Sequence, residues 1–224
     1  MRKVLLAASA FLICLSGQSW ADIVRCTDID VTVNSDSVAL AQEVCTAAVQ
    51  AQTQFQQCNL GSTSNPLRVD IVETLPDSCV GLYHCQQDWI ELLAPSLMQT
   101  LRKEDGAFHF LSETAYFRSV VVHELAHAAF DKERCPFDGC VVGNEYVAYA
   151  MQVMSLSADD RSAFEVHAGL NRRVSVVELT RLLLDLAPER FAARAWTHLQ
   201  QRDDPCGYIG EIVSGAVLLD RERF

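Results

Sequence analysis

The chain has few residues that interrupt regular structure and few that carry positive charge. It contains 6 prolines and 10 glycines among 224 residues, far fewer than a collagen-like repeat or a disordered linker requires. Its 18 Lys and Arg residues are outnumbered by 29 Asp and Glu residues, which gives a formal net charge of −11. No stretch gathers basic residues, so we expect no nucleic-acid partner and no attraction to anionic membranes.

Long apolar runs are also missing, apart from one near the N-terminus. Residues 4–15 are apolar, follow two basic residues, and lead to the small residues Ser19 and Ala21. This order predicts a signal peptide over residues 1–21 that is cleaved after Ala21. No later run reaches the ~18 apolar residues of a transmembrane helix. We therefore predict a periplasmic or secreted protein without membrane insertion.

The chain has no Cys-x-x-Cys pair, the spacing common in cysteine-ligated zinc sites. Eight of its nine cysteines lie beyond residue 21, and an even number in an exported chain indicates disulfides. Two pairs would close short loops: Cys79 with Cys85, and Cys135 with Cys140. Since eight cysteines permit about 105 pairings, the rest of the connectivity stays open.

Apolar periodicity changes along the chain. Alternating residues predict strands over 23–33, 67–72, 80–84 and 89–93, with a long helix over 38–58 after the first strand. Later segments show a helical period and carry capping residues at several starts. The predicted helices are 96–102, 112–130, 144–156, 157–170, 175–187, 188–200 and 209–219. A mixed first part and an all-helical region over about 157–224 predict an α+β fold in a single domain, 22–224.

The motif that carries chemistry lies in the predicted helix 112–130 and reads His123-Glu-Leu-Ala-His127. Residues four apart project from the same helix face, so both imidazoles can bind one zinc ion at about 2.0–2.1 Å. Glu124 is then the expected general base. The neighbouring residues are apolar on nearly every side, which predicts a buried helix whose polar residues need partners. The alternative is a hydrogen-bonded pair of core histidines.

A second motif, Asn-Glu-Tyr-Val-Ala-Tyr over residues 144–149, begins the next predicted helix. Together the two motifs resemble the gluzincin branch of the zincin metallopeptidases, in which a Glu on the second helix is the third zinc ligand. The resemblance implies that His123, His127 and Glu145 hold one zinc ion and that Glu124 is the base. It also implies a small zincin-like core: a long helix, a short mixed sheet, an active-site helix and a ligand-bearing helix.

The sequence departs from the family pattern at one supporting position. Several gluzincins have an Asp four residues after the ligand Glu, where it orients a His; this chain has Tyr149. Tyr149 either orients a ligand or stabilises an oxyanion, or it fills the core. Asp131, Glu133 and His167 are rival third ligands. The resemblance further implies an edge strand along which peptide substrates lie, and residues 89–93 are the candidate.

The motifs and the resemblance predict an exported zinc metallopeptidase-like hydrolase acting on a peptide or protein substrate. Glu124 would accept a proton from a zinc-activated water that attacks the peptide carbonyl. Two alternatives stay open: a non-catalytic, zinc-containing binding or scaffold protein of the periplasm, and a zinc hydrolase of other bonds. The acidic balance favours basic peptides, provided that the acidic charge gathers at the cleft. The oligomeric state stays open.

Overall fold

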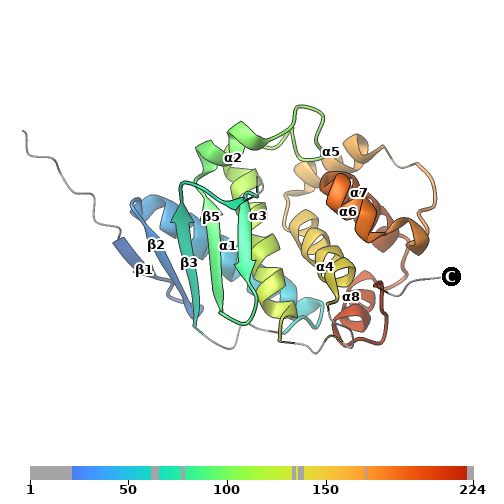
Figure 1. The fold of residues 1–224 in the computed structure, drawn as a ribbon, viewed down its shortest axis with the longest axis horizontal. Helices are drawn as coiled ribbons and strands as arrows, with labels where there is room; N and C mark the ends of the chain where they lie inside the picture. The colour runs from blue at the N-terminus through green and yellow to red at the C-terminus, as the bar shows by residue number, and fades with distance from the viewer. Residues whose placement is uncertain are drawn as a thin grey trace, which may run out of the picture.

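The computed structural model describes residues 22–61, 66–76, 79–132, 135, 139–169 and 171–220, which form an α+β fold as predicted (Figure 1). A mixed sheet lies at one end of the molecule and the C-terminal helices at the other, with α3 between them and α1 packed on the sheet beside α3. The predicted signal peptide lies outside the described residues. None of the described helices is long and apolar enough to cross a bilayer.

The sheet has the strand order β1-β2-β3-β5-β4. Its strands are β1 (Asp22–Arg25), β2 (Val31–Ser35), β3 (Leu67–Val72), β4 (Gly81–His84) and β5 (Trp89–Leu93). The three inner strands run parallel, and β1 and β4 add antiparallel at the two edges. The prediction that residues 89–93 form the edge strand is therefore wrong. β5 pairs on one side with β3 and on the other with β4, which folds back on it as a hairpin.

The single strand predicted over 23–33 is in fact two strands, β1 and β2. The chain turns between them, where the Cys26 backbone N–H donates to the Val31 carbonyl at 2.9 Å. The Cys26–Cys45 disulfide ties this turn to the first helix. Alternation alone did not reveal the reversal, because β1 is too short and too exposed to show a pattern of its own, while the alternation of β2 extends back to Ile29 in the turn.

Most of the predicted helices are present with shifted ends. They are α1 (Val38–Gln57), α2 (Pro95–Leu101), α3 (Glu113–Phe130), α4 (Val141–Met154), α5 (Ala158–Ala168), α6 (Arg181–Leu186), α7 (Pro188–Gln200) and α8 (Pro205–Val213). The predicted helix 175–187 is divided into a 3₁₀ turn (Val176–Glu178) and α6. Leu179 leaves helical geometry, and Thr180 caps a new helix. The last helix begins at Pro205 rather than at 209, since the Asp204 side chain accepts from the Gly207 N–H.

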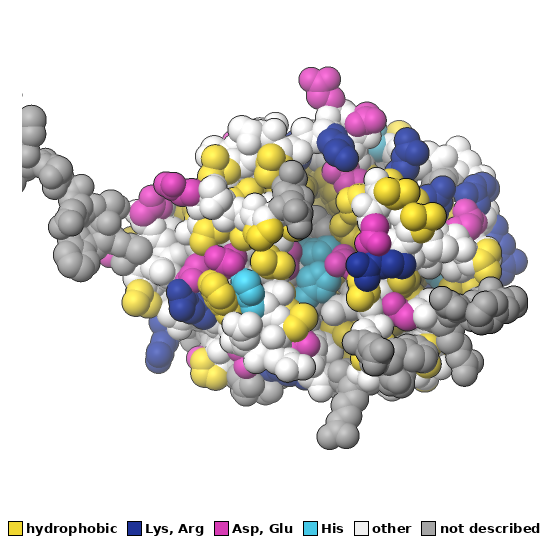
Figure 2. Space-filling view, viewed as in Figure 1, with side chains coloured by type: hydrophobic (Ala, Val, Ile, Leu, Met, Phe, Trp, Pro, Cys, Tyr) yellow, Lys and Arg dark blue, Asp and Glu magenta, His cyan; other side chains and the backbone are white. Residues whose placement is uncertain are grey.

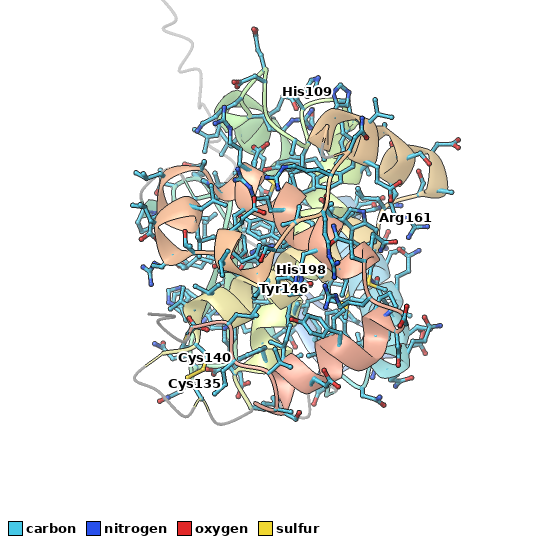
Figure 3. The ribbon with its side chains drawn as sticks, turned by 90° about the vertical axis from the view of Figure 1, so that its right-hand side faces the viewer. His109, Cys135, Cys140, Tyr146, Arg161 and His198 are labelled. Atoms are coloured by element: carbon cyan, nitrogen blue, oxygen red, sulfur yellow. A yellow bond between two sulfur atoms is a disulfide. The ribbon has the colours of Figure 1, made fainter. Side chains whose placement is uncertain are left out.

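Helix α3 is the centre of the core. Ser112 caps it, and it packs against α1, β4, β5 and α4. Because α3 has neighbours on all sides, its apolar residues are distributed around the whole helix rather than along one face. The predicted burial of this helix is confirmed. Helix α4 in turn packs on α7, where Tyr146 Oη and His198 Nδ1 hydrogen bond at 3.0 Å in the interior (Figure 3). This packing fixes α4 relative to α7, while its direct contact with α3 sets its position at the core.

The structure forms disulfides in the described residues between Cys26 and Cys45, Cys58 and Cys206, and Cys135 and Cys140 (Figure 3 labels the last pair). The predicted short loop closed by Cys135 and Cys140 is confirmed. Three disulfides indicate that the protein occupies an oxidising compartment.

The other short pair, Cys79 with Cys85, is not joined by a disulfide. The two cysteines lie at opposite ends of β4. Four extended residues span about 13 Å, whereas bridged cysteines have Cα atoms no more than about 7 Å apart. The predicted pair was thus incompatible with the strand that was predicted between its members.

Candidate metal centre

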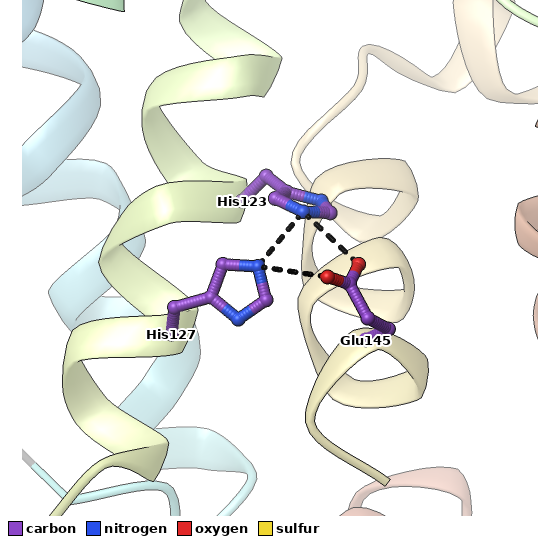
Figure 4. A group of neighbouring side chains, drawn as sticks. All are labelled: His123, His127 and Glu145. Carbon is purple, nitrogen blue, oxygen red and sulfur yellow. Dashed lines mark hydrogen bonds and ion pairs between the residues drawn. The ribbon is translucent and has the colours of Figure 1, made fainter. Parts of the chain in front are cut away.

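Two imidazoles and one carboxylate meet between α3 and α4. His123 and His127 lie one turn apart on α3, and Glu145 faces them from the first half of α4 (Figure 4). The two Nε2 atoms are 3.0 Å apart. Glu145 Oε2 is 3.5 Å from His123 Nε2, and Glu145 Oε1 is 3.6 Å from His127 Nε2. The three predicted ligands are therefore brought together.

Amide side chains hold the far side of each imidazole. His127 Nδ1 is 2.7 Å from Asn144 Oδ1, and His123 Nδ1 is 3.1 Å from Gln152 Oε1. The orientation of Gln152 is set by a chain of hydrogen bonds: its Nε2 donates to Ser119 Oγ, which donates to the Tyr116 carbonyl. Each Nδ1 therefore donates its proton to an amide oxygen, and each Nε2 is left with a lone pair.

This arrangement fits a bound cation. Two lone pairs facing each other at 3.0 Å repel unless a positive charge lies between them. Ligand atoms about 2.0–2.1 Å from a tetrahedral ion lie roughly 3.3–3.4 Å from one another. The distances among His123, His127 and Glu145 are close to that spacing. The group could thus hold a metal ion.

The electrostatics of Glu145 favour its role as an anionic ligand. Burial acts to raise the pKa of its carboxyl, but in the metal-free site the charges that His127 and His123 carry when protonated, and the hydrogen bond with His123, oppose burial and lower the pKa to about 2. Glu145 is therefore ionised at neutral pH and contributes a negative charge to the centre.

Glu124 lies on α3 beside the ligands but points toward the edge strand β4. It is 5% exposed, and burial raises the pKa of its carboxyl to about 7, although the charge of His127 and a hydrogen bond from the Tyr83 backbone N–H act to lower it. The carboxylate also lies against Gly81, where a Cβ atom would come within 2.5 Å of Glu124 Oε1. β4 therefore leaves room for this carboxyl only because residue 81 has no side chain.

Tyr149 lies on the same face of α4 as Glu145, one turn later. Its ring meets the ring of His123 edge-on, with the centroids 4.5 Å apart, and packs at 6.2 Å from Phe191. Burial, together with the charges of Glu145 and other nearby groups, raises the pKa of its phenol well above the usual value. The hydroxyl thus keeps its proton as a donor, while the ring fills space beside a ligand.

The rival third ligands lie elsewhere. Asp131 accepts hydrogen bonds from Tyr83 Oη at 3.0 Å and from the Gln86 backbone N–H at 2.7 Å, and so ties the β4–β5 hairpin to the end of α3. His167 stacks on Phe110 with the ring centroids 4.9 Å apart. Neither belongs to the cluster of potential ligands found in the described part of the chain. Glu133 lies outside the described residues.

The centre opens into a cleft of about 1130 Å³ lined by β4, α3, α4, the connection between α2 and α3, and the start of α7. Figure 2 shows histidine side chains at the bottom of this hollow, with hydrophobic and charged groups on both sides. A metal ion in the centre would therefore be accessible to a ligand from solvent. Such an accessible position distinguishes catalytic metal sites from closed structural ones.

The sequence analysis assigned no role to three residues that support the site: Asn144, Gln152 and Gly81. Gln152 is a buried polar residue in an apolar stretch of α4, seven residues after Glu145 and hence on the same face. This spacing from Glu145 could have identified Gln152 as a residue of the site. The position four residues after Glu145, which is an Asp in the family pattern, is Tyr149 in this chain, and the amide of Gln152 further along the helix is the partner of His123 instead.

We expect Gln152→Ala to weaken metal binding about 10-fold to 100-fold, the usual cost of losing a partner that orients a ligating His. The substitution leaves the His123 Nδ1–H without its acceptor and releases the ring. Metal affinity is measured by competition with a chromophoric chelator. Gln50→Ala, at an exposed position of α1, is the matched control. Equal affinities for the two variants would show that Gln152 does not orient the ligand.

The sequence model of a family of unknown function, DUF6639, matches residues 31–222 of the chain. This match spans the sheet from β2 onward, both ligand-bearing helices and the C-terminal helices. No curated protein and no solved structure matched the chain.

Proposed function

The chain belongs to the DUF6639 family, and we propose that it is an exported, zinc-dependent hydrolase of the gluzincin type that cleaves peptide bonds. One observation carries the proposal: His123, His127 and Glu145 converge at the bottom of an open cleft, with the buried carboxyl of Glu124 beside them. A structural metal site would need neither the cleft nor this additional carboxyl.

Zinc is the metal that the donor set favours. Two imidazole nitrogens and one carboxylate oxygen suit this borderline ion, and three protein ligands leave a fourth position open. When bound, zinc would supply Lewis-acid polarisation of a carbonyl and would acidify water at the site. The three disulfides support export to the periplasm or the exterior, where thiols are oxidised.

The chain's own residues would move the proton and orient the substrate. Glu124, with a pKa of about 7, can accept a proton at neutral pH and pass it to the departing amine. The Tyr83 N–H holds its carboxylate in place. The Tyr149 hydroxyl can donate to the negative charge that develops on the carbonyl oxygen. One edge of β4 pairs with β5; on its other edge the Tyr83 N–H is bonded to Glu124, so an extended peptide would pair with the backbone groups on either side of it.

The test combines metal analysis with a broad substrate survey. We expect purified protein to contain one zinc ion per chain by mass spectrometry. We also expect it to cleave members of a proteome-derived peptide library, with loss of cleavage after chelation and recovery when zinc is added. Stoichiometric zinc without cleavage of any library member would instead favour a binding or scaffold protein. Folded protein that takes up no metal would overturn the proposal.

A further inference from the structure

Helix α4, which carries Asn144 and Glu145 near its start, is not capped by the residues that precede it. Its N-cap residue is Cys140, which forms a disulfide, and its side chain accepts no hydrogen bond from the first turn. The N–H groups at a helix start have no partner within the helix, and Val142 and Gly143 are buried from water. The start of α4 therefore needs acceptors from elsewhere in the chain.

Asp220 supplies these acceptors from the far end of the chain. The Val142 N–H donates to Asp220 Oδ1 at 2.7 Å, and the Gly143 N–H donates to Asp220 Oδ2 at 2.9 Å. A carboxylate at this position also interacts favourably with the positive end of the helix dipole. Because two adjacent N–H groups are bound by two different oxygens, the first turn of α4 is fixed in both its position and its rotation.

The segment that carries Asp220 is itself anchored. After α8 the chain folds back on that helix, where the Val217 N–H donates to the Glu211 carbonyl at 2.9 Å. Helix α8 packs beside α4 (Figure 1), and the disulfide between Cys206 and Cys58 ties its start to the end of α1. The C-terminal segment thus connects the first turn of α4 to the rest of the fold.

We propose that Asp220 is a positioning residue of the metal centre, which acts by setting the rotation of α4 at which Glu145 and Asn144 face the imidazoles. Gly143 precedes these two residues directly, so a rotation of the first turn displaces both side chains. Asn144 Oδ1 lies 2.7 Å from His127 Nδ1, a contact that tolerates little displacement. This role rests on the metal centre of the proposed function and adds to it a residue that touches none of the three ligands.

Asp220→Asn tests this role in the full chain. Asn keeps the shape and one oxygen, but its NH₂ group faces an N–H donor instead of accepting from it. We expect zinc affinity, measured by chelator competition at neutral pH, to fall about 10-fold, the lower end of the range for losing a supporting partner. Asp70→Asn is the matched control, because Asp70 on β3 accepts from the side chains of Arg68 and Trp89 but supports no ligand. That variant should keep the wild-type affinity.

Two further variants distinguish positioning from general support of the fold. If Asp220 acts through the ligand on α4, Asp220→Asn should cost less zinc affinity in a chain that already carries Glu145→Gln than in the wild-type chain. Asp220→Glu keeps both oxygens on a side chain that is longer by one methylene. Its zinc affinity should therefore lie between those of the wild-type chain and Asp220→Asn.

The outcomes separate this proposal from the proposed function. Wild-type affinity in folded Asp220→Asn, or in Asp220→Glu if only that variant folds, would overturn the role of Asp220. Equal losses with and without Glu145→Gln would also overturn it, because they would show support of the fold alone. Zinc affinity that depends on Asp220 in a chain that cleaves no peptide would refute the hydrolase function and leave the positioning role standing. Folded protein that takes up no metal would overturn both.

Discussion

Replacing Glu124 with Gln is expected to lower peptide hydrolysis by about 10²-fold to 10⁴-fold, the contribution typical of a general base. Gln has nearly the same shape and keeps an oxygen that can accept from the Tyr83 N–H, but an amide does not take up a proton at neutral pH. Zinc content should stay at one ion per chain, because Glu124 is not among the ligands. Turnover of a peptide from the library survey and metal analysis measure the two effects.

Glu113→Gln provides the matched control, since Glu113 is exposed in the first turn of the same helix. That variant should keep full turnover. If E124Q kept full turnover as well, Glu124 would not be the base. If it lost zinc together with activity, the loss of activity would say nothing about proton transfer, and the carboxyl would instead support the metal centre.

Replacing Glu145 with Gln is expected to weaken zinc binding by more than about 100-fold, the upper range for losing only a supporting partner. The substitution removes the single negative charge among the three ligands and leaves two neutral imidazoles. A chelator competition titration at neutral pH measures the affinity. Asp159→Asn, at an exposed position of α5, makes the same change of charge away from the site and should leave zinc affinity unaltered. If Glu145→Gln kept its zinc affinity, Glu145 would not be the third ligand, and Glu133 would be the next candidate.

Elements that depend on local periodicity could be predicted from the sequence. The predictions for α1 and α3 agree with the structure to within a residue, because both are long and begin at Ser caps. The edge position of β4 and the reversal between β1 and β2 were not predicted, because strand order follows from pairing between segments distant in the chain. For the same reason the Cys58–Cys206 disulfide, which joins residues 148 apart, could not be selected among many pairings.

The candidate site likewise contains residues that a local pattern predicts and residues whose positions depend on packing between distant segments. His123 and His127 are related by a helical repeat, which is visible in one short motif. Glu145 was predicted from the resemblance of the two motifs, taken together, to a known family, and the structure brings Glu145 to the same point as the two histidines. The hydrogen bonds of Asn144 and Gln152 depend on how α4 is rotated against α3. That rotation is set by packing, including the contact of Tyr149 with His123, and no local pattern encodes it.

The residue at the position of Gly81 can be used to classify other DUF6639 chains from their sequences. Any larger residue at this position would displace the Glu124 carboxyl, since even a methyl group would meet three of its atoms within 2.9 Å. A relative with both histidines and the ligating glutamate but a bulky residue at the equivalent place would still capture its ion. On the proposed function, it would have lost the geometry for turnover. The residue at this one position would then distinguish chains proposed to be catalysts from chains that hold an ion without catalysis.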